Sequence, residues 1–227
     1  MLEIGPGLGA LTEPLIEAGV SLVAVERDDR LADDLVRRWP GLRLVRGDAM
    51  KLDFAELLAG DGWSCVSNLP YNVGTHLVGR MVRLPDVFCC LVVMLQREVA
   101  ERICAAPGNK TYGALSVEVQ ARARADVVLR VKPGSFHPPP KVDSAVIRLD
   151  LGRPEATRGV DLGVLDRLAR ASFGQRRKTL RRSLGSMMGR DAAIAMLERA
   201  GVDPGARPEQ LALVDFANMA NEYEDGA

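Results

Sequence analysis

Short apolar runs alternate with segments of helical periodicity over the first hundred residues, and few folds accommodate that order. Strands are expected at 1–4, 21–26, 42–46, 63–67 and 87–95, and helices at 10–18, 29–38 and 74–82. Parallel neighbouring strands need crossover connections, which are usually helices, so this order predicts βαβ units and a parallel sheet. The apolar runs are continuous, as in strands that are covered on both faces. The sequence therefore predicts an α/β fold.

The pattern changes beyond residue 111, where a helix and two strands are expected at 112–123, 126–131 and 142–151. Three consecutive prolines at 138–140 fix φ and provide no amide donors, which predicts a rigid extended loop between those strands. After Gly152 the periodicity is helical only, at 162–173, 178–188, 192–200 and 208–221. We therefore predict two domains, a sheet domain at 1–154 and a small all-helical domain at 155–227.

Composition excludes several classes of protein. The longest apolar run, at 87–95, has nine residues, whereas a membrane-spanning helix needs ~20. No basic-then-apolar leader opens the sequence, so we expect a cytoplasmic protein. The cysteines and histidines lack the paired spacing of metal ligands or of a disulfide framework, so no metal site is expected. These residues are Cys65, Cys89, Cys90, Cys104, His76 and His137.

The formal net charge of zero conceals a strong asymmetry along the chain. Residues 1–120 carry 12 Lys and Arg against 16 Asp and Glu, residues 121–190 carry 16 against 6, and residues 191–227 carry 2 against 8. The central excess suggests a surface that faces a polyanion such as RNA. A solvated helix face is the alternative. The densest basic segment contains Arg176, Arg177, Lys178, Arg181 and Arg182.

A glycine-rich turn, Glu3-Ile4-Gly5-Pro6-Gly7-Leu8-Gly9, lies between the first expected strand and the first expected helix. Glycines permit a tight turn and let the backbone approach a ligand closely. The spacing G-x-G-x-G is shorter than the dinucleotide fingerprint, and an acidic residue two positions before the first glycine suits S-adenosylmethionine better than a pyrophosphate. We expect Glu3, Gly5 and Gly7 to contact this cofactor, although many α/β folds share such a turn.

Two acidic residues stand where the second and third expected strands end. Glu26, with Arg27 beside it, lies seventeen residues after Gly9, where a carboxylate can accept both hydroxyls of a ribose. Asp48, followed by Ala49, can accept from an adenine amino group. Taken alone, either acid could instead cap a helix. Because the carboxyl ends of parallel strands share one edge of a sheet, these four residues are expected to line one cofactor crevice.

The sequence Asn68-Leu69-Pro70-Tyr71 directly follows the fourth expected strand. An exocyclic adenine amine is a poor nucleophile because its lone pair is delocalised into the ring. The Asn68 amide oxygen and the Pro70 carbonyl are expected to accept its two N–H bonds, which favours a pyramidal nitrogen. Tyr71 offers a face on which the base can stack. Catalysis would then rest on positioning and electrostatics. A plain proline turn with a buried tyrosine is the alternative.

Four stretches of the sequence together resemble one enzyme family. They are the glycine turn at 3–12, Asn68-Leu69-Pro70-Tyr71-Asn72, the segment Met94-Leu95-Gln96-Arg97-Glu98-Val99 and the proline-rich segment at 136–144. The chain is similar to the small-subunit (16S) rRNA adenine-N6,N6-dimethyltransferases of the KsgA/RsmA type. The resemblance implies a Rossmann-like S-adenosylmethionine-dependent methyltransferase fold. It also implies transfer of four methyl groups to two adjacent adenines near the 3′ end of small-subunit rRNA, late in ribosome assembly.

The resemblance assigns roles residue by residue. Gly5, Glu26, Asp48 and Asn68 match the family's cofactor contacts, and Asn68, Leu69, Pro70 and Tyr71 match its pocket for the target base. Phe136 matches an aromatic that stacks on the flipped adenine from the other side, and the basic segment at 176–182 corresponds to a surface used on rRNA. The implied partner is small-subunit rRNA within an immature 30S particle, with no membrane, and we expect a monomer.

The sequence departs from the family at its start. Family members carry an arm before the glycine turn, with a Gln-Asn-Phe-Leu segment that closes over the cofactor. In this sequence only Met1–Ile4 precede the turn, which predicts weaker cofactor binding and a destabilised sheet.

Three other functions fit parts of the same pattern. The large-subunit rRNA adenine methyltransferases of macrolide resistance share the Asn-x-Pro-Tyr pocket, but the proline-rich segment and the helical tail favour the small-subunit enzymes. A ribosome-assembly factor whose binding matters more than its chemistry is a second alternative. A DNA adenine methyltransferase is less favoured, because no separate DNA-recognition module is visible.

Overall fold

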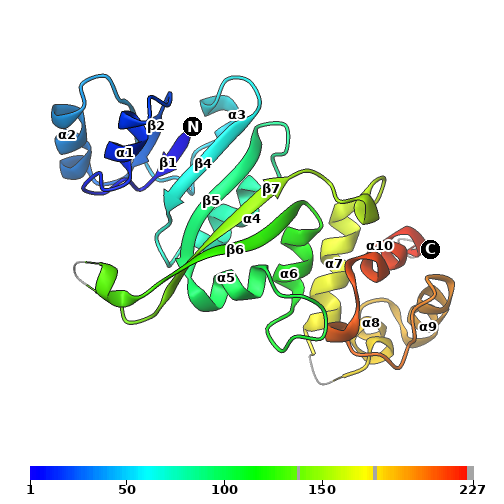
Figure 1. Ribbon diagram of the computed structural model, residues 1–227. Coiled ribbons are helices and arrows are strands. Elements are labelled where there is room, and N and C mark those ends of the chain that lie inside the picture. The colour runs from blue at the N-terminus through cyan, green and yellow to red at the C-terminus, as the bar shows by residue number, and fades with distance from the viewer. Residues whose placement is uncertain (137–138, 176–177, 224–227) are drawn as a thin grey trace. The chain divides into compact units, whose positions relative to one another are not determined.

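The computed structural model describes residues 1–136, 139–175 and 178–223. The chain forms two compact units (Figure 1). The first comprises Met1–Ala100 and Arg124–Gly152, and the second comprises Glu101–Ala123 and Arg153–Ala227. The division after Gly152 lies close to the domain boundary that the sequence predicts after residue 154. Residues 101–123, which the sequence predicts in the first domain, instead pack within the second unit.

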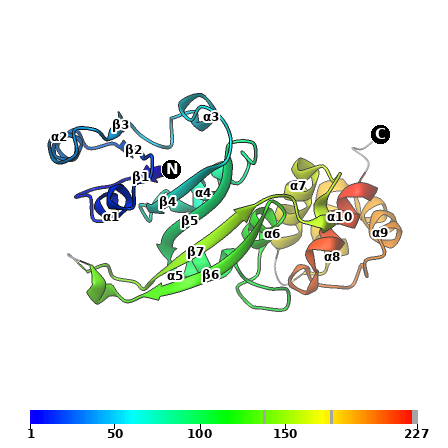
Figure 2. The same cartoon turned by 45° about the horizontal axis from the view of Figure 1, so that its top comes forward.

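A seven-stranded sheet forms the first unit, with the strand order β3-β2-β1-β4-β5-β7-β6 (Figure 2). The strands are β1 (Leu2–Ile4), β2 (Val23–Glu26), β3 (Arg43–Arg46), β4 (Trp63–Asn68), β5 (Phe88–Gln96), β6 (Ala123–Val131) and β7 (Ser144–Leu151). Strands β1 to β5 pair in parallel, whereas β7 pairs antiparallel with β5. The predicted α/β fold with parallel strands is therefore confirmed over the first five strands.

Helices connect the parallel strands: α1 (Thr12–Glu17), α2 (Asp29–Arg38), α3 (Phe54–Leu57) and α4 (Gly74–Met81). Helix α2 has the predicted bounds because Asp28 caps it, accepting hydrogen bonds from the amides of Arg30 and Leu31. The sequence did not predict α3, which has four residues and is too short to show a period. It also did not predict α5 (Arg97–Ile103), which begins directly where β5 ends and so lacks a separating loop.

The strand order reverses at β1, which lies between β2 and β4. Ligands of open α/β sheets bind outside the carboxyl ends of the strands at such a switch point. Strand β1 pairs with β4 only at Leu2 and Cys65. Beyond that pair, the Ile4 amide donates to the Ser67 hydroxyl at 2.8 Å rather than to a carbonyl of β4. The main-chain ladder therefore stops short of the carboxyl ends of these two strands.

Strand β7 carries the proline-rich segment to the same edge of the sheet. Because β7 is antiparallel to β5, its first residue, Ser144, pairs with the last residue of β5, Gln96. The carbonyl of the preceding residue, Asp143, accepts a hydrogen bond from the Arg97 amide at 2.9 Å, and the Asp143 carboxylate forms an ion pair with the Arg97 guanidinium. The segment between β6 and β7, with the short helix η1 (Pro133–Ser135), is thereby anchored near the carboxyl ends of the parallel strands.

The second unit is helical, as the sequence predicts for the C-terminal region. Its helices are α6 (Ala114–Gln120), α7 (Leu162–Phe173), α8 (Leu180–Met188), α9 (Arg190–Arg199) and α10 (Leu213–Glu222), with short turns at η2 (Glu155–Thr157) and η3 (Pro208–Gln210). Phe173 lies edge-on to Tyr112 and stacked on Phe216 within the core. Several boundaries differ from the prediction. Helix α6 ends three residues early because β6 begins at Ala123, and the stretch from Pro208 forms η3 before α10 starts.

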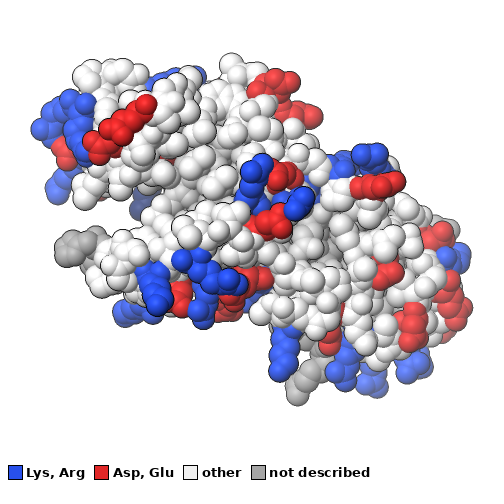
Figure 3. Space-filling view, viewed as in Figure 1, with Lys and Arg blue, Asp and Glu red and all other residues white. Residues whose placement is uncertain are grey.

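Charged side chains lie at the surface of both units (Figure 3), with four exceptions among the described residues. Arg122 and Asp166 are buried as a pair in the second unit, joined by two hydrogen bonds of 2.8 and 2.9 Å. Glu3 and Glu26 are buried in the first unit. Buried charged groups need hydrogen-bond partners. The partners of Glu3 and Glu26 lie in and around the glycine turn, where the candidate site is found.

Within the described residues, no helix has the length and apolar character needed to cross a membrane.

Candidate active site

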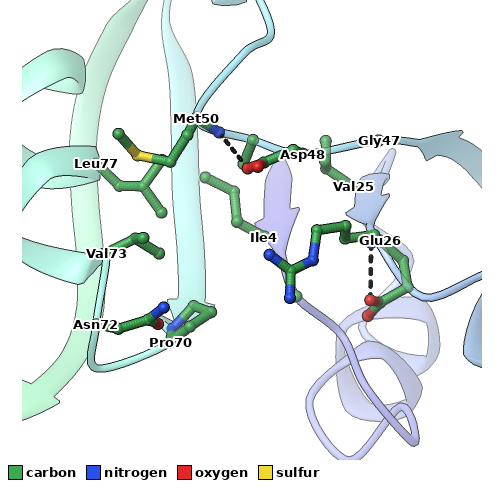
Figure 4. A pocket seen from close by; sticks show the side chains of 13 residues that line it. Ile4, Val25, Glu26, Gly47, Asp48, Met50, Pro70, Asn72, Val73 and Leu77 are labelled. Carbon is green, nitrogen blue, oxygen red and sulfur yellow. Dashed lines mark hydrogen bonds between the residues drawn. The ribbon is translucent and has the colours of Figure 1, made fainter.

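A pocket opens at the carboxyl ends of β1, β2 and β3 and faces the start of α4 (Figure 4). Figure 4 shows Glu26 and Asp48 on one side of this pocket, with Pro70, Asn72, Val73 and Leu77 across from them. Its lining residues are Ile4, Gly5, Val25, Glu26, Arg27, Gly47, Asp48, Ala49, Met50, Pro70, Asn72, Val73 and Leu77. We call this the cofactor pocket. Five of the predicted cofactor residues line it: Gly5, Glu26, Arg27, Asp48 and Ala49.

The glycine turn uses a backbone conformation that other residues rarely adopt. Gly5, Gly7 and Gly9 have φ values of 67°, 59° and 84°. The Gly5 amide donates to the Val25 carbonyl at 2.9 Å, which ties the turn to β2. A Cβ on Gly9 would lie 2.5 Å from the Trp39 ring, so this position also lacks space for a side chain. The turn is therefore held in one shape against the sheet.

Glu26 is fixed at the pocket wall by the main chain. Its Oε1 accepts from the amides of Arg27 at 2.8 Å and Asp28 at 2.9 Å, and its Oε2 accepts from the Gly7 amide at 3.1 Å. The cap of α2 is Asp28, so the alternative that Glu26 caps this helix does not hold. Its carboxylate instead links the glycine turn to the end of β2 and keeps a negative charge beside the pocket.

Asp48 shapes the segment that follows β3. Its Oδ1 accepts from the Met50 amide at 2.9 Å, which closes a turn rather than capping a helix. The cap of the next helix, α3, is Asp53. Asp48 therefore stands on a turn at the pocket wall (Figure 4), where its carboxylate can accept further hydrogen bonds.

Three predicted cofactor residues do not line this pocket. Glu3 is 2% exposed, and its Oε2 accepts from the Thr12 hydroxyl at 2.8 Å beneath the glycine turn. Burial raises the pKa of Glu3 to about 7. Gly7 lies at the glycine turn but lines a separate surface hollow beside α2. Asn68 lines a second pocket instead.

The second pocket is formed by the residues that the sequence assigns to the target base. Its lining residues are Asn68, Leu69, Pro70, Tyr71, Phe136 and Pro140. We call this the base pocket. Pro70 lines both pockets, so they lie next to each other at this residue. The structure therefore brings Phe136 to Tyr71, from which it is separated by 65 positions in the sequence.

The Pro70 carbonyl is already engaged. Its oxygen accepts from the amides of Val73 at 3.1 Å and Gly74 at 2.8 Å, and these hydrogen bonds begin α4. A carbonyl oxygen has two lone pairs, so the prediction that this oxygen receives an amine of the substrate does not hold. The Leu69 carbonyl, next to Asn68, receives no hydrogen bond from the described residues.

Two residues that the sequence did not single out hold these pockets in place. The Tyr71 hydroxyl lies 2.6 Å from the hydroxyl of Ser144, which is fully buried at the start of β7. The Arg80 guanidinium donates to backbone carbonyls next to Asp48. Ser144 ends the proline-rich segment at 136–144, but no role was predicted for it from the sequence, because its partner lies 73 positions away, as the partners of Arg80 lie about 30 positions away.

The predicted RNA-binding residues lie at the start of α8. Lys178, Arg181 and Arg182 are exposed, while Leu180 and Leu184 of the same segment are buried in the second unit. Arg176 and Arg177 lie outside the described residues. Helix α8 starts at Leu180, two residues later than the sequence predicts. The exposed basic side chains fit both the RNA surface and the solvated helix face that the sequence leaves open.

Comparison with known proteins assigns the chain to a family. Residues 1–225 match the family described as ribosomal RNA adenine dimethylase. The "Ribosomal RNA small subunit methyltransferase A" of Pseudomonas aeruginosa is 42% identical over 99% of this chain and 84% of its own length. The protein of the same name from Geobacter sulfurreducens is 44% identical over 96% of this chain and 83% of its own length.

Solved structures agree with this assignment. A dimethyladenosine transferase from Plasmodium falciparum superposes with a TM-score of 0.81 at 27% identity, covering 96% of this chain and 87% of that one. The 23S rRNA methyltransferase ErmE superposes with a TM-score of 0.71 at 23% identity, covering 97% and 89%. The latter likeness shows the fold, a methyltransferase sheet with the observed strand order followed by helices. The chain therefore belongs to the ribosomal RNA adenine dimethylase family.

Proposed function

We propose that this protein transfers methyl groups from S-adenosylmethionine to the N6 atoms of two adjacent adenines near the 3′ end of small-subunit rRNA. One observation carries the proposal. The cofactor pocket and the base pocket share Pro70 as a lining residue, so a methyl donor and an acceptor amine can come close together. The names of its bacterial relatives, small-subunit methyltransferases, support the choice of rRNA.

The cofactor pocket fits S-adenosylmethionine on the chemistry of its own residues. The left-handed glycines keep side chains away from the turn, so a ligand can approach the backbone. The fixed carboxylate of Glu26 can accept hydrogen bonds from the two ribose hydroxyls of the cofactor, and the carboxylate of Asp48 can accept from its adenine amino group. Apolar side chains at Ile4, Val25 and Leu77 complete a surface suited to a purine ring. When bound, S-adenosylmethionine supplies a methyl group on a positively charged sulfur.

The base pocket supplies the acceptor. The Asn68 amide oxygen and the Leu69 carbonyl accept the two N–H groups of the adenine amine. The Leu69 carbonyl takes the part that the sequence predicts for the Pro70 carbonyl. This arrangement directs the nitrogen lone pair away from the ring. The aromatic side chains of Tyr71 and Phe136, which line the same pocket, stack on the base. The residues act by holding the amine in position and by electrostatic stabilisation, and no proton needs to be removed before attack.

The substrate adenines must leave their stack to enter this pocket, because bases within A-form RNA cannot be reached. The proposed substrate is an immature 30S particle with these bases in a loop or junction, and a protein that acts on it would work in the cytoplasm during small-subunit assembly. The exposed basic residues Lys178, Arg181 and Arg182 supply an rRNA-facing surface on the second unit. The protein acts as a monomer.

Primer extension on both rRNAs tests this function, since N6,N6-dimethyladenine stops reverse transcription. Cells that lack the gene should lose the stop near the 3′ end of small-subunit RNA, and the wild-type gene should restore it. Asn68→Ala should not restore it, because loss of one positioned acceptor costs about 10²–10³-fold in rate. The variant should still bind immature small subunits. A stop lost only from large-subunit RNA would overturn the proposal, as would full complementation by Asn68→Ala.

A further inference from the structure

Arg80, near the end of α4, holds the chain segment that follows β3. Its Nη1 donates to the carbonyls of Ala49 and Met50, both at 2.8 Å, and its Nη2 donates to the Leu52 carbonyl at 2.6 Å. Its guanidinium carbon lies 5.2 Å from the centre of the Phe54 ring, close enough for a cation–π contact. One side chain thus satisfies three carbonyls of an irregular segment that has no strand or helix partner of its own.

This segment is the part of the cofactor pocket that carries Asp48. Asp48, Ala49 and Met50 line the pocket. Two hydrogen bonds to Asp48 close the turn, from the Met50 amide to its carboxylate and from the Lys51 amide to its carbonyl. The Gly47 amide ties the start of the segment to β2 through the Glu26 carbonyl, and Arg80 holds the part that follows Asp48. If the hydrogen bonds of Arg80 are removed, the turn keeps its local bonds and its link to β2 but loses its attachment to α4.

Helix α4 also supplies the opposite wall. Val73 precedes the helix and Leu77 lies one turn before Arg80, and both line the cofactor pocket across from Asp48 (Figure 4). Arg80 therefore joins the two walls and fixes the distance between them. The base pocket does not depend on this link, because the start of α4 is held separately by the Pro70 carbonyl.

We propose that Arg80 is a positioning residue that sets the affinity for the adenosine half of the cofactor. The inference rests on the proposed function, since it assumes that the pocket takes S-adenosylmethionine with its adenosine half at Asp48. Arg80 acts through the 48–52 segment and touches neither reacting group. Its loss should therefore weaken cofactor binding while the rate at saturating cofactor stays near that of the wild type.

The test compares Arg80→Ala and Arg80→Lys with Arg83→Ala. Arg83 lies just past the end of α4 and donates to the Gly79 carbonyl of that helix rather than to the 48–52 segment, so it is a matched control. We expect Arg80→Ala to raise the KM for S-adenosylmethionine about 10–100-fold with kcat changed less than about twofold. Arg80→Lys, whose ammonium can reach fewer carbonyls at once, should recover part of the loss. Arg83→Ala should leave both constants near wild type.

Calorimetry with two further ligands locates the effect. S-adenosylhomocysteine and 5′-methylthioadenosine, which lacks the amino-acid half, should lose affinity for Arg80→Ala by the same factor. Unchanged affinity for 5′-methylthioadenosine would overturn the inference, as would a fall in kcat without a rise in KM in the folded Arg80→Lys variant. If the wild-type protein bound none of the three ligands, the proposed function itself would fail, and the two failures are thereby distinguished.

Discussion

The cofactor pocket and the base pocket meet at Pro70 but are held together in different ways. The walls of the cofactor pocket are fixed by hydrogen bonds to the main chain: Glu26 accepts three backbone amides, and Arg80 donates to three backbone carbonyls. The segments of the base pocket are each held by main-chain bonds of their own, and a side-chain contact between the Tyr71 and Ser144 hydroxyls joins them. The cofactor pocket is thus fixed wall by wall to the main chain, whereas the base pocket joins the turn after β4 to the start of β7, from distant parts of the sequence.

This difference predicts how strongly a substitution at each pocket should affect binding. Main-chain attachments transmit the loss of one side chain to a whole wall, so substitutions around the cofactor pocket should have large effects on ligand binding. A side-chain contact between two loops contributes only the net value of one hydrogen bond. Three substitutions test the comparison, beginning with the largest expected effect.

Glu26→Ala should weaken S-adenosylmethionine binding most. It removes the carboxylate offered to the ribose and also leaves the amides of Gly7, Arg27 and Asp28 without their acceptor. Hydrogen bonds to charged groups contribute about 1.5–3 kcal/mol each. Loss of the two hydrogen bonds between the carboxylate and the ribose hydroxyls therefore corresponds to a rise in the Kd for S-adenosylmethionine of about 1,000-fold. Isothermal titration calorimetry measures it. Glu13→Ala, which changes an exposed glutamate of α1, is the control and should leave Kd unchanged. A change below about tenfold for Glu26→Ala would show that the wall does not bind the ribose.

The buried Glu3 beneath the glycine turn should make the stability of the cofactor side depend on pH. Its pKa is raised from 4.5 to about 7 in the folded protein, so the folded state binds more protons than the unfolded chain between these values. The stability that Glu3 contributes is therefore present in full below pH 4.5 and is lost as the pH rises through about 7. The shift corresponds to about 3 kcal/mol at most.

Glu3→Gln separates this effect from the rest of the molecule, because glutamine can still accept from the Thr12 hydroxyl. In urea unfolding, the free energy of unfolding of the wild type should fall relative to Glu3→Gln between pH 5 and pH 8. Thr12→Ala, which removes the hydroxyl donor but keeps Glu3, should retain the pH dependence. Parallel pH profiles for the wild type and Glu3→Gln would contradict the raised pKa.

Ser144→Ala should have the smallest effect and should act on the base pocket alone. Loss of the contact with the Tyr71 hydroxyl frees the ring on which the adenine stacks, at a cost of about 1 kcal/mol, or about fivefold in kcat. The KM for S-adenosylmethionine should not change. Tyr71→Phe should match it, and the double variant should be no worse than either single variant, because all three remove the same interaction. Ser64→Ala, at the opposite end of β4, is the control. Additive losses in the double variant would rule out the shared contact.

Local patterns in the sequence predicted the parts of the site that depend on local structure. The glycine turn, Glu26 and Asp48 each follow a strand, and the ends of parallel strands share one edge, so their meeting at one pocket was predictable. The role of the Pro70 carbonyl was mispredicted: the sequence placed a helix at 74–82, but it did not show that the first amides of this helix, those of Val73 and Gly74, take that oxygen.

Long-range contacts could not be read from the sequence. The partners of Arg80 follow a different strand, and those of Tyr71 depend on the antiparallel register of β7 against β5. Arg80 sits in a helix at a position where an arginine usually indicates only solvent exposure. The same reason applies to residues 101–123: the sequence predicted a helix at 112–123, close to α6 (Ala114–Gln120), but the place of this helix in the second unit depends on its packing against α7.

Because Pro70 lines both pockets, the cofactor pocket and the base pocket are neighbours at a single residue. If filling one of them changed the affinity of the other, thermodynamic linkage would make the effect reciprocal: the factor by which the donor changes affinity for RNA would equal the factor by which RNA changes affinity for the donor.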